Sequence, residues 1–178
     1  KKSMLKKIIF ITAILSSSIA FAQENEINTL ILNGNYNLAS QKVNNVLIDH
    51  PENINARFQY ATILSLTQKG DAAIEEFQKI IRTNSNFVEA YNNIAVIYAQ
   101  QGLYEKSQEY LQKAIEINPK YNTAIENLGD LYIKMALQTY KKVLANDLNN
   151  ENTMIKYIKV KSLAIDSGNN NIQKIIKN

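Results

Sequence analysis

The side chains with catalytic potential are few and widely separated in this 178-residue sequence. His50 is the one histidine and directly precedes Pro51, and there is no cysteine to act with it as a nucleophile or a zinc ligand. The zinc-protease pattern HExxH, the nucleophile pattern GxSxG and the phosphate-binding pattern GxxxxGK do not occur. A turn or surface position is the simplest interpretation of His50. The sequence therefore predicts no enzyme, no metal site and no cofactor.

The carboxylates and tyrosines also occur at positions expected for helices, and their spacing does not indicate a catalytic cluster. Glu75 and Glu76 precede Lys79 by four and three residues, the spacing at which opposite charges meet on one helix face. The tyrosines at core positions of the repeat described below are Tyr60, Tyr91, Tyr98 and Tyr132. Packing explains these side chains better than cofactor binding does.

The first 22 residues have the pattern of a secretory signal peptide. A positively charged stretch ends at Lys7, an apolar run covers residues 8–15, and Ala20 and Ala22 occupy the two positions that signal peptidase reads. We expect cleavage between Ala22 and Gln23, and no lipid anchor, because no cysteine follows. The apolar run is too short to cross a hydrocarbon core of roughly 30 Å. An uncleaved N-terminal anchor is the alternative.

The formal charge of +4 belongs to this leader. It contains four of the 20 Lys and Arg residues and none of the 16 Asp and Glu residues, so the rest of the chain is neutral. A nucleic-acid partner therefore loses its compositional support and is not expected. We expect export to the periplasm of a Gram-negative bacterium, where a chain without disulfides depends on packing for stability.

A 34-residue repeat organises the remaining chain. Units that start at Ile54, Val88 and Asn122 have a small residue at their eighth position and a large apolar residue at their seventh and eleventh. In the first two of these units, small residues recur at the twentieth position (Ala73 and Ser107) and large apolar ones at the twenty-fourth (Phe77 and Leu111). Pro51 and Pro119 both occupy a thirty-second position. The preceding unit has matching residues at positions 15, 17, 20 and 24, which are Gly34, Tyr36, Ala39 and Val43.

These residue types suit pairs of antiparallel helices. Small side chains let two backbones approach closely, and large ones fill the space between neighbouring units. Gly102 supplies a turn that needs a positive φ, and Pro119 ends a helix. With these residues the sequence resembles the tetratricopeptide repeat family, most closely over residues 88–121, VEAYNNIAVIYAQQGLYEKSQEYLQKAIEINPKY. The resemblance covers residues 24–148 and is closest to secreted proteobacterial members. It implies an all-α, right-handed superhelical solenoid of antiparallel helix pairs with C-terminal capping helices.

The repeat phase divides the chain into a signal peptide (1–22), a repeat domain (23–150) and a helical cap or tail (151–178). The units are 23–53, 54–87, 88–121 and 122–150, the last shortened by five residues. Cleavage removes the start of the first unit, which we expect to act as a cap. Helices are expected over residues 24–33, 36–49, 54–68, 71–83, 88–101 and 104–117.

The fourth unit departs from the pattern. No Gly, Pro or Asn stands between Leu131 and Ala145, and apolar residues keep a helical spacing throughout. We therefore predict one continuous helix over residues 122–146, with a tight turn near residues 134–137 as the competing interpretation. A homodimer through this long helix is a further hypothesis.

The tail is expected to form a capping helix from Glu151 to Ile165, with Ile155, Ile158 and Leu163 on its buried face, although residues 155–161 also alternate like a strand. A short last helix would follow the break at Ser167-Gly168. The lysines at this end are interpreted as a solvated face of the helix. Contact with phosphate or lipid headgroups is the more specific alternative.

Ligand binding is placed by the resemblance on the first helix of each unit, whose side chains line a concave groove in this family. Asn93 and Asn127 match the position of an asparagine ladder with which some members hold an extended peptide, and an amide can both donate to a carbonyl and accept from an N–H. Satisfying the local backbone is the competing role. The predicted contact residues are Phe58, Gln59, Thr62, Asn92, Asn93, Val96, Glu126, Asn127 and Asp130.

The groove lacks the Lys and Arg set with which some relatives clamp a C-terminal carboxylate. Glu89, Glu126 and Asp130 make it mildly acidic, which favours a neutral or basic extended segment or a helix. The sequence thus predicts a non-enzymatic scaffold or adaptor that binds a peptide or protein partner. An envelope assembly chaperone that grips unfolded segments is the alternative, and an enzyme or peptidoglycan-binding accessory is a third class for which no motif is present.

Overall fold

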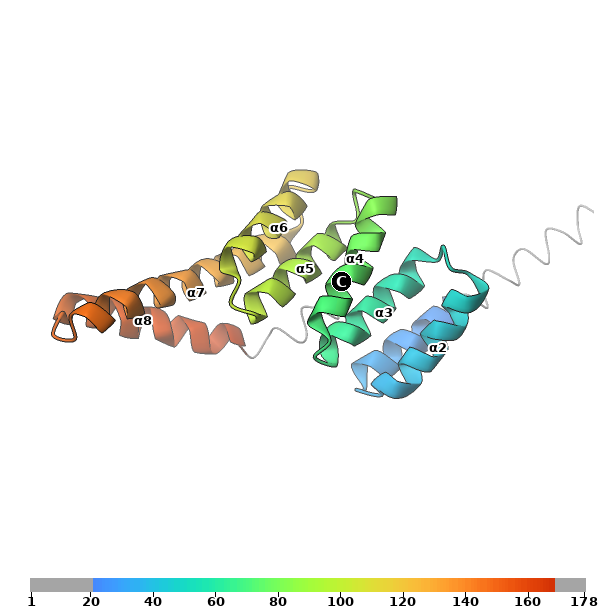
Figure 1. The fold of residues 1–178 in the computed structure, drawn as a ribbon, viewed down its shortest axis with the longest axis horizontal. Helices are drawn as coiled ribbons and strands as arrows, with labels where there is room; N and C mark the ends of the chain where they lie inside the picture. Colours follow the sequence, from blue (N-terminus) through green and yellow to red (C-terminus); the bar gives the residue numbers. More distant parts are fainter. Residues whose placement is uncertain (1–20, 169–178) are drawn as a thin grey trace, which may run out of the picture.

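The computed structural model describes residues 21–168, and within them every regular element is a helix paired with its neighbours in sequence (Figure 1). Each helix packs on the one before and the one after it, and α3, α5 and α7 also contact one another in turn. The predicted all-α solenoid of antiparallel helix pairs is confirmed. The elements are a helical segment over residues 21–32, α2 (Tyr36–Asp49), α3 (Ile54–Leu66), α4 (Gly70–Thr83), α5 (Val88–Gln100), α6 (Tyr104–Ile117), α7 (Asn122–Asn146) and α8 (Glu151–Gly168).

The core is divided into three apolar clusters, one at each junction between successive helix pairs. Val43, Phe77 and Leu111 occupy the same repeat position, lie in different clusters and are at most 1% exposed. The small residues that precede each by four positions are equally buried, as close helix approach requires. They are Ala39, Ala73 and Ser107.

The turns inside the first three units share one geometry. Gly34, Gln68 and Gly102, which are 34 residues apart, have φ angles of 74°, 62° and 76°. Each lies just past the end of a helix, and the next residue donates its N–H to a carbonyl five residues back, at 2.9 Å in all three turns. This is the Schellman arrangement, which satisfies the last carbonyls of a helix. The turn therefore requires the left-handed conformation even where glutamine replaces glycine.

The fourth unit has no such turn. Its equivalent residue is Ala136, and α7 runs through it without a break from Asn122 to Asn146. The prediction of one continuous helix is confirmed, and the competing turn near residues 134–137 is wrong. As a result Tyr132, which the repeat pattern places in the core, is 48% exposed, because α7 does not fold back to cover it.

A substitution of Gly129 can test whether the fourth unit lacks the second helix that packs on this position in the other units. It occupies the position where Ala61 and Ala95 are fully buried, yet a methyl group added to Gly129 meets no atom within 4 Å. Because alanine is favoured over glycine inside a helix, Gly129→Ala should raise the free energy of unfolding by roughly 0.5–1 kcal/mol. Urea denaturation measures the change. A loss of stability would show that a second helix packs at this position.

The helix α8 begins at Glu151 as predicted, which excludes the strand alternative, but its orientation corrects the sequence prediction. Ile155, Ile158 and Leu163 are 53%, 58% and 56% exposed rather than buried. The half-buried positions recur every three or four residues on another face, toward α7. They are Thr153, Tyr157, Val160 and Ala164. The predicted last helix lies outside the described residues.

An ion-pair network joins the two helices of the second unit. The carboxylate of Glu76 on α4 accepts from Arg57 of α3 at 2.8 Å and from Lys79 at 2.5 Å, which confirms the predicted pairing along α4. The Arg57 guanidinium also donates to the carbonyl oxygen of Pro51 at 2.6 Å. Burial acts to raise the pKa of Glu76, but the hydrogen bonds and charges of Lys79 and Arg57 outweigh it and hold the pKa below its ordinary value.

This network predicts a pH-dependent contribution to stability. Because the folded pKa of Glu76 is lowered, its contribution is complete above the ordinary value of 4.5 and is lost as the pH falls through the folded pKa. Glu76→Gln should lower the free energy of unfolding by roughly 1–2 kcal/mol at neutral pH. The difference in this free energy between the variant and the parent protein should disappear on acidification. Urea unfolding across this range measures it, with Glu75→Gln on the exposed side of α4 as control. A pH-independent gap would contradict the prediction.

Candidate functional site

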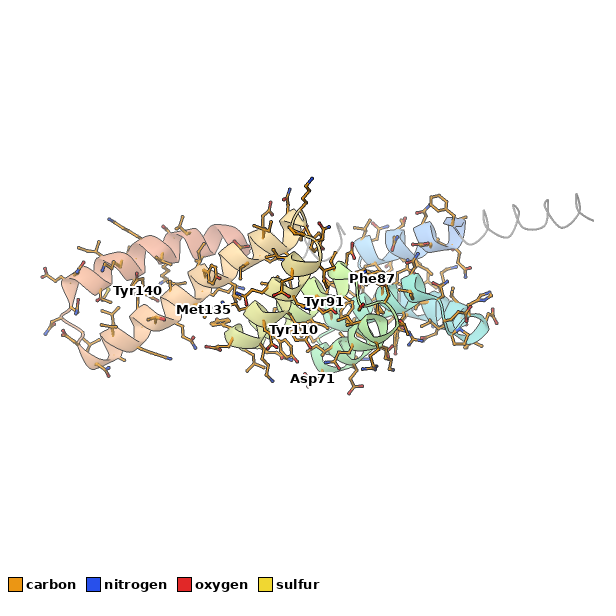
Figure 2. The ribbon with its side chains drawn as sticks, turned by 90° about the horizontal axis from the view of Figure 1, so that it is seen from above. Asp71, Phe87, Tyr91, Tyr110, Met135 and Tyr140 are labelled. Atoms are coloured by element: carbon orange, nitrogen blue, oxygen red, sulfur yellow. The ribbon has the colours of Figure 1, made fainter. Side chains whose placement is uncertain are left out.

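A cavity of about 420 Å³ opens between residues 21–32, α3 and the start of α5. Phe58 and Phe87 form its apolar side, with ring centroids 5.4 Å apart, and Phe58 also meets the buried ring of Phe77 edge-on at 5.5 Å. Figure 2 shows Phe87 at the junction between the N-terminal helices and the middle of the solenoid. The remaining lining residues are Glu24, Asn28, Ile31, Leu32, Asn55, Gln59, Thr62 and Glu89.

The charge of this cavity is negative. Glu24 and Glu89 line it, and its lining includes no lysine or arginine. Glu24 Oε2 accepts from Asn55 Nδ2 at 3.5 Å, and Glu89 lies in the first turn of α5, where the helix dipole favours a carboxylate. Burial raises the pKa of Tyr121, and the carboxylate of Glu89 raises it further. The two carboxylates thus make a site suited to a cation.

Gln59 and Thr62 line the cavity and also hold its wall in place. The Gln59 amide donates to Asn28 Oδ1 at 2.8 Å and to the carbonyl oxygen of Glu24 at 3.1 Å. Thr62 Oγ1 donates to the carbonyl oxygen of Phe58 at 2.9 Å. Gln59 and Thr62 are 6% and 4% exposed, so little of either side chain faces solvent. The Gln59 hydrogen bonds join the first helix of the solenoid to α3, and the Thr62 hydrogen bond lies within α3.

A second, much smaller hollow of about 20 Å³ lies between α5 and α7. Val96, Asn127 and Asp130 are among its lining residues, and its volume has room for about one water molecule. Glu126 is exposed and lines neither hollow. Of the nine predicted groove residues, three thus line the cavity, three line the small hollow, and Asn92, Asn93 and Glu126 line neither.

The asparagines are buried between repeats. Asn127 Nδ2 donates to Asn92 Oδ1 at 2.7 Å, and Asn92 Nδ2 donates to Asn93 Oδ1 at 3.3 Å. Asn92, Asn93 and Asn127 are 0%, 2% and 7% exposed. The chain of amides links α5 to α7, as Gln59 links α3 to the first helix. The structure thus provides a local hydrogen-bonding role for Asn92 and Asn127, and ligand contact by these residues stays a prediction.

Asn93 breaks this regularity. Its Nδ2 is buried and has no hydrogen-bond partner within the described part of the chain. Gln59 and Asn127, at the same repeat position, both donate to the preceding unit, Gln59 to the backbone carbonyl oxygen of Glu24 and Asn127 to Asn92 Oδ1. Phe58 occupies the position of Asn92 in the unit before Asn93, and its side chain has no acceptor. Asn93 therefore lacks the side-chain acceptor that Asn127 has.

Sequence reasoning missed part of the cavity. Glu24, Asn28 and Leu32 come from the segment interpreted as a shortened cap, and Phe87 lies just before α5. The only signal for Phe87 was a large aromatic residue directly before a repeat unit, which does not by itself distinguish a ligand site from packing. His50 is exposed, as predicted, with Nδ1 3.6 Å from Glu52 Oε1.

Among the side chains that the structure describes, no three of His, Asp or Glu are placed to hold a metal ion together. The predicted cleavage site between Ala22 and Gln23 lies within the helical segment 21–32, and its processing stays a prediction. Across the described residues, none of the helices combines the length and apolar character needed to span a bilayer.

Comparison with known proteins agrees with this architecture. Residues 88–121 match the family model for the tetratricopeptide repeat. The chain is 34% identical to the Photosystem I assembly protein Ycf3 of Synechococcus sp. strain CC9311 over 91 residues, which is 46% of this chain and 53% of that protein. The chain thus spans about half the length of that relative.

Two solved structures show the same fold. The pilF protein of Pseudomonas aeruginosa superposes with a TM-score of 0.59 at 20% identity, covering 82% of this chain and 68% of that one. The first repeat domain of Spaghetti (RPAP3), solved with the HSP90 peptide SRMEEVD, superposes with a TM-score of 0.58 at 16% identity, covering 66% and 93%. The family match thus identifies one tetratricopeptide repeat at residues 88–121, and the two structures share the fold of this chain.

Proposed function

We propose that this tetratricopeptide repeat solenoid is a non-enzymatic interaction module that binds a neutral or basic segment of a partner protein in its concave cavity. The observation that carries the proposal is the cavity of about 420 Å³ in which Phe58 and Phe87 stand beside Glu24 and Glu89, with no lysine or arginine in its lining. The aromatic faces and the carboxylates would together attract a lysine or arginine side chain through cation–π contact and charge.

The related peptide complex supports the general mode of binding, while the charge of the cavity favours a different ligand. The HSP90 peptide SRMEEVD contains three acidic side chains. Residues 23–130 of this chain contain thirteen Asp and Glu against eight Lys and Arg. An acidic peptide would therefore meet an unfavourable field, whereas a basic segment would be attracted to the cavity.

Charge reversal at the cavity tests this function. Short unstructured peptides that differ only in a central Lys, Leu or Glu should bind in the order Lys, Leu, Glu, as measured by fluorescence anisotropy. The double variant Glu24→Lys with Glu89→Lys should weaken binding of the lysine peptide by roughly tenfold or more and reverse the order of affinities. Glu105→Lys with Glu109→Lys, on exposed positions of α6, is the matched control and should leave the order unchanged. Equal binding of all three peptides by the parent would contradict the proposal.

An envelope assembly chaperone is the alternative function, supported by the assembly role in the name of the Synechococcus relative. Such a protein would bind many unfolded segments with little preference and suppress the aggregation of an unrelated denatured protein. A sequence-selective peptide profile without such suppression would exclude it.

We also propose that the module acts in the periplasm of a Gram-negative bacterium. Support comes from the basic, apolar and small-residue pattern of residues 1–22. Expression in a Gram-negative host followed by mass spectrometry of the periplasmic fraction should find a chain that starts at Gln23. A chain that keeps residues 1–22 in the cytosolic fraction would contradict this location.

A further inference from the structure

The outer face of α8 has a stripe of apolar side chains that no other helix of the described chain covers. While one side of this helix packs on α7, Ile155 and Ile158 on the other side are 53% and 58% exposed, and Met154 beside them is 36% exposed. Leu148 in the preceding turn is 76% exposed. Figures 1 and 2 show α7 and α8 as a two-helix arm that projects beyond α6. The stripe is therefore accessible along the arm.

Lysines border this stripe on both sides. In an α-helix Ile155, Ile158 and Ser162 fall on one face, and Lys159 and Lys161 then fall on its opposite edges. The exposed Glu151 lies on the same face in the first turn of the helix. Lys159 and Lys161 are both exposed, and the Lys161 ammonium lies 5.8 Å from the centroid of the Tyr157 ring. Long lysine side chains can lay their methylene groups along an apolar surface and extend their charges beyond it.

Lysines outnumber acidic residues in the part of the arm that follows Asp130. Residues 131–168 contain six lysines and three acidic residues, in contrast to the acidic balance of residues 23–130. Exposed apolar side chains and lysines thus coincide on this part of the arm.

We infer that the outer face of α8 binds the surface of lipid bilayers that contain anionic phospholipids, with Ile155 and Ile158 at the acyl boundary and the bordering lysines at the phosphates. This combination of an apolar stripe with basic edges is the chemistry by which helices lie in a membrane interface. A second copy of the chain is the competing occupant, through the predicted homodimer. Two such faces would bring lysine edges together, which disfavours the dimer. The inference is independent of the concave cavity.

A single labelled position can report this contact in the full chain. The sequence has no cysteine, so Ser162→Cys creates one site for an environment-sensitive fluorophore on the stripe. Vesicles of phosphatidylcholine with phosphatidylglycerol should shift its emission to the blue, and vesicles of phosphatidylcholine alone should not. A label at Glu105→Cys on α6 is the matched control and should not respond. Because the label is local, vesicle binding through residues 1–22 without contact by α8 should leave its emission unchanged.

Two sets of substitutions separate the apolar and basic contributions. Ile155→Ser with Ile158→Ser should weaken vesicle binding by about tenfold or more, since both side chains lose apolar contact. Lys156→Gln, Lys159→Gln and Lys161→Gln together should weaken it by on the order of a hundredfold, about fivefold for each lysine. The matched set Lys106→Gln, Lys113→Gln and Lys120→Gln, outside the arm, should have little effect. Circular dichroism would show that each variant keeps its helices.

Several results would overturn the inference. They are the absence of a shift at residue 162 with anionic vesicles, an equal shift with neutral vesicles, and equal losses in the two lysine sets. A dimer in sedimentation velocity that Ile155→Ser with Ile158→Ser dissociates would assign the face to a second copy instead.

Discussion

Replacing Phe77 with alanine is expected to lower the free energy of unfolding by about 3–5 kcal/mol. The side chain is 0% exposed, belongs to the central apolar cluster and meets the Phe58 ring edge-on at 5.5 Å. Alanine would remove this aromatic contact and leave a cavity between two helix pairs. Because each pair in a solenoid contacts only its neighbours, the loss cannot be shared with a larger core.

Urea denaturation would measure this change, and hydrogen exchange would locate it. Phe87→Ala is a suitable comparison because Phe87 is half-buried beside the same cluster, and it should cost only about 1–2 kcal/mol. Amide protons of α3, α4 and α5 should lose more protection than those of α7. A loss below about 1 kcal/mol for Phe77→Ala would show that the neighbouring helices close the gap, contrary to the expected rigidity of this cluster.

Removing the amide of Asn92 is the second large effect that we expect, at about 2–3 kcal/mol. Asn92→Ala would leave Asn127 Nδ2 without the acceptor that now lies 2.7 Å away, in a place with little access to water. Asn93→Ala should cost less, because it removes only the longer hydrogen bond of 3.3 Å from Asn92 Nδ2, together with a buried Nδ2 that has no partner. The three buried asparagines are therefore not equivalent in energy, although they look alike in sequence.

A double-mutant cycle would test whether Asn92 and Asn127 act as a pair. The single variants Asn92→Ala and Asn127→Ala and the combined variant should give a coupling energy of roughly 0.5–3 kcal/mol. A coupling near zero, together with weaker binding of the lysine peptide, would assign Asn127 to ligand contact instead. The cycle thus decides between the inter-repeat role that the structure provides and the peptide ladder that the sequence suggests.

The cavity and the α8 face occupy regions of opposite charge, although the chain after residue 22 is neutral as a whole. Glu24 and Glu89 make the cavity acidic, while residues 131–168 contain six lysines and three acidic residues. The proposed module would then hold a basic segment in its solenoid and approach an anionic surface with its arm. The two activities can be removed separately, since their substitutions lie on different helices.

Much of the fold could be predicted from the sequence because the repeat is local. Small residues such as Ala73 and large ones such as Phe77 recur every 34 residues, and each packs only against adjacent helices, so their spacing determines helix bounds and core positions together. The lack of a turn residue near Ala136 likewise predicted the continuous α7, since glycine or another residue with positive φ is what ends the earlier first helices.

Tertiary structure alone decided which polar and apolar side chains are covered. Asn92 and Asn127 are buried because α5 and α7 approach closely enough for their amides to meet, a distance that spacing along the chain does not specify. In α8 both faces carry apolar residues, so only its contact with α7 determines that Tyr157 is half-buried while Ile155 and Ile158 are exposed. The sequence by itself determined the repeated helices and their turns, since these depend on local residue types. The binding surfaces depend on how separate helices meet, and the structure was needed to define them.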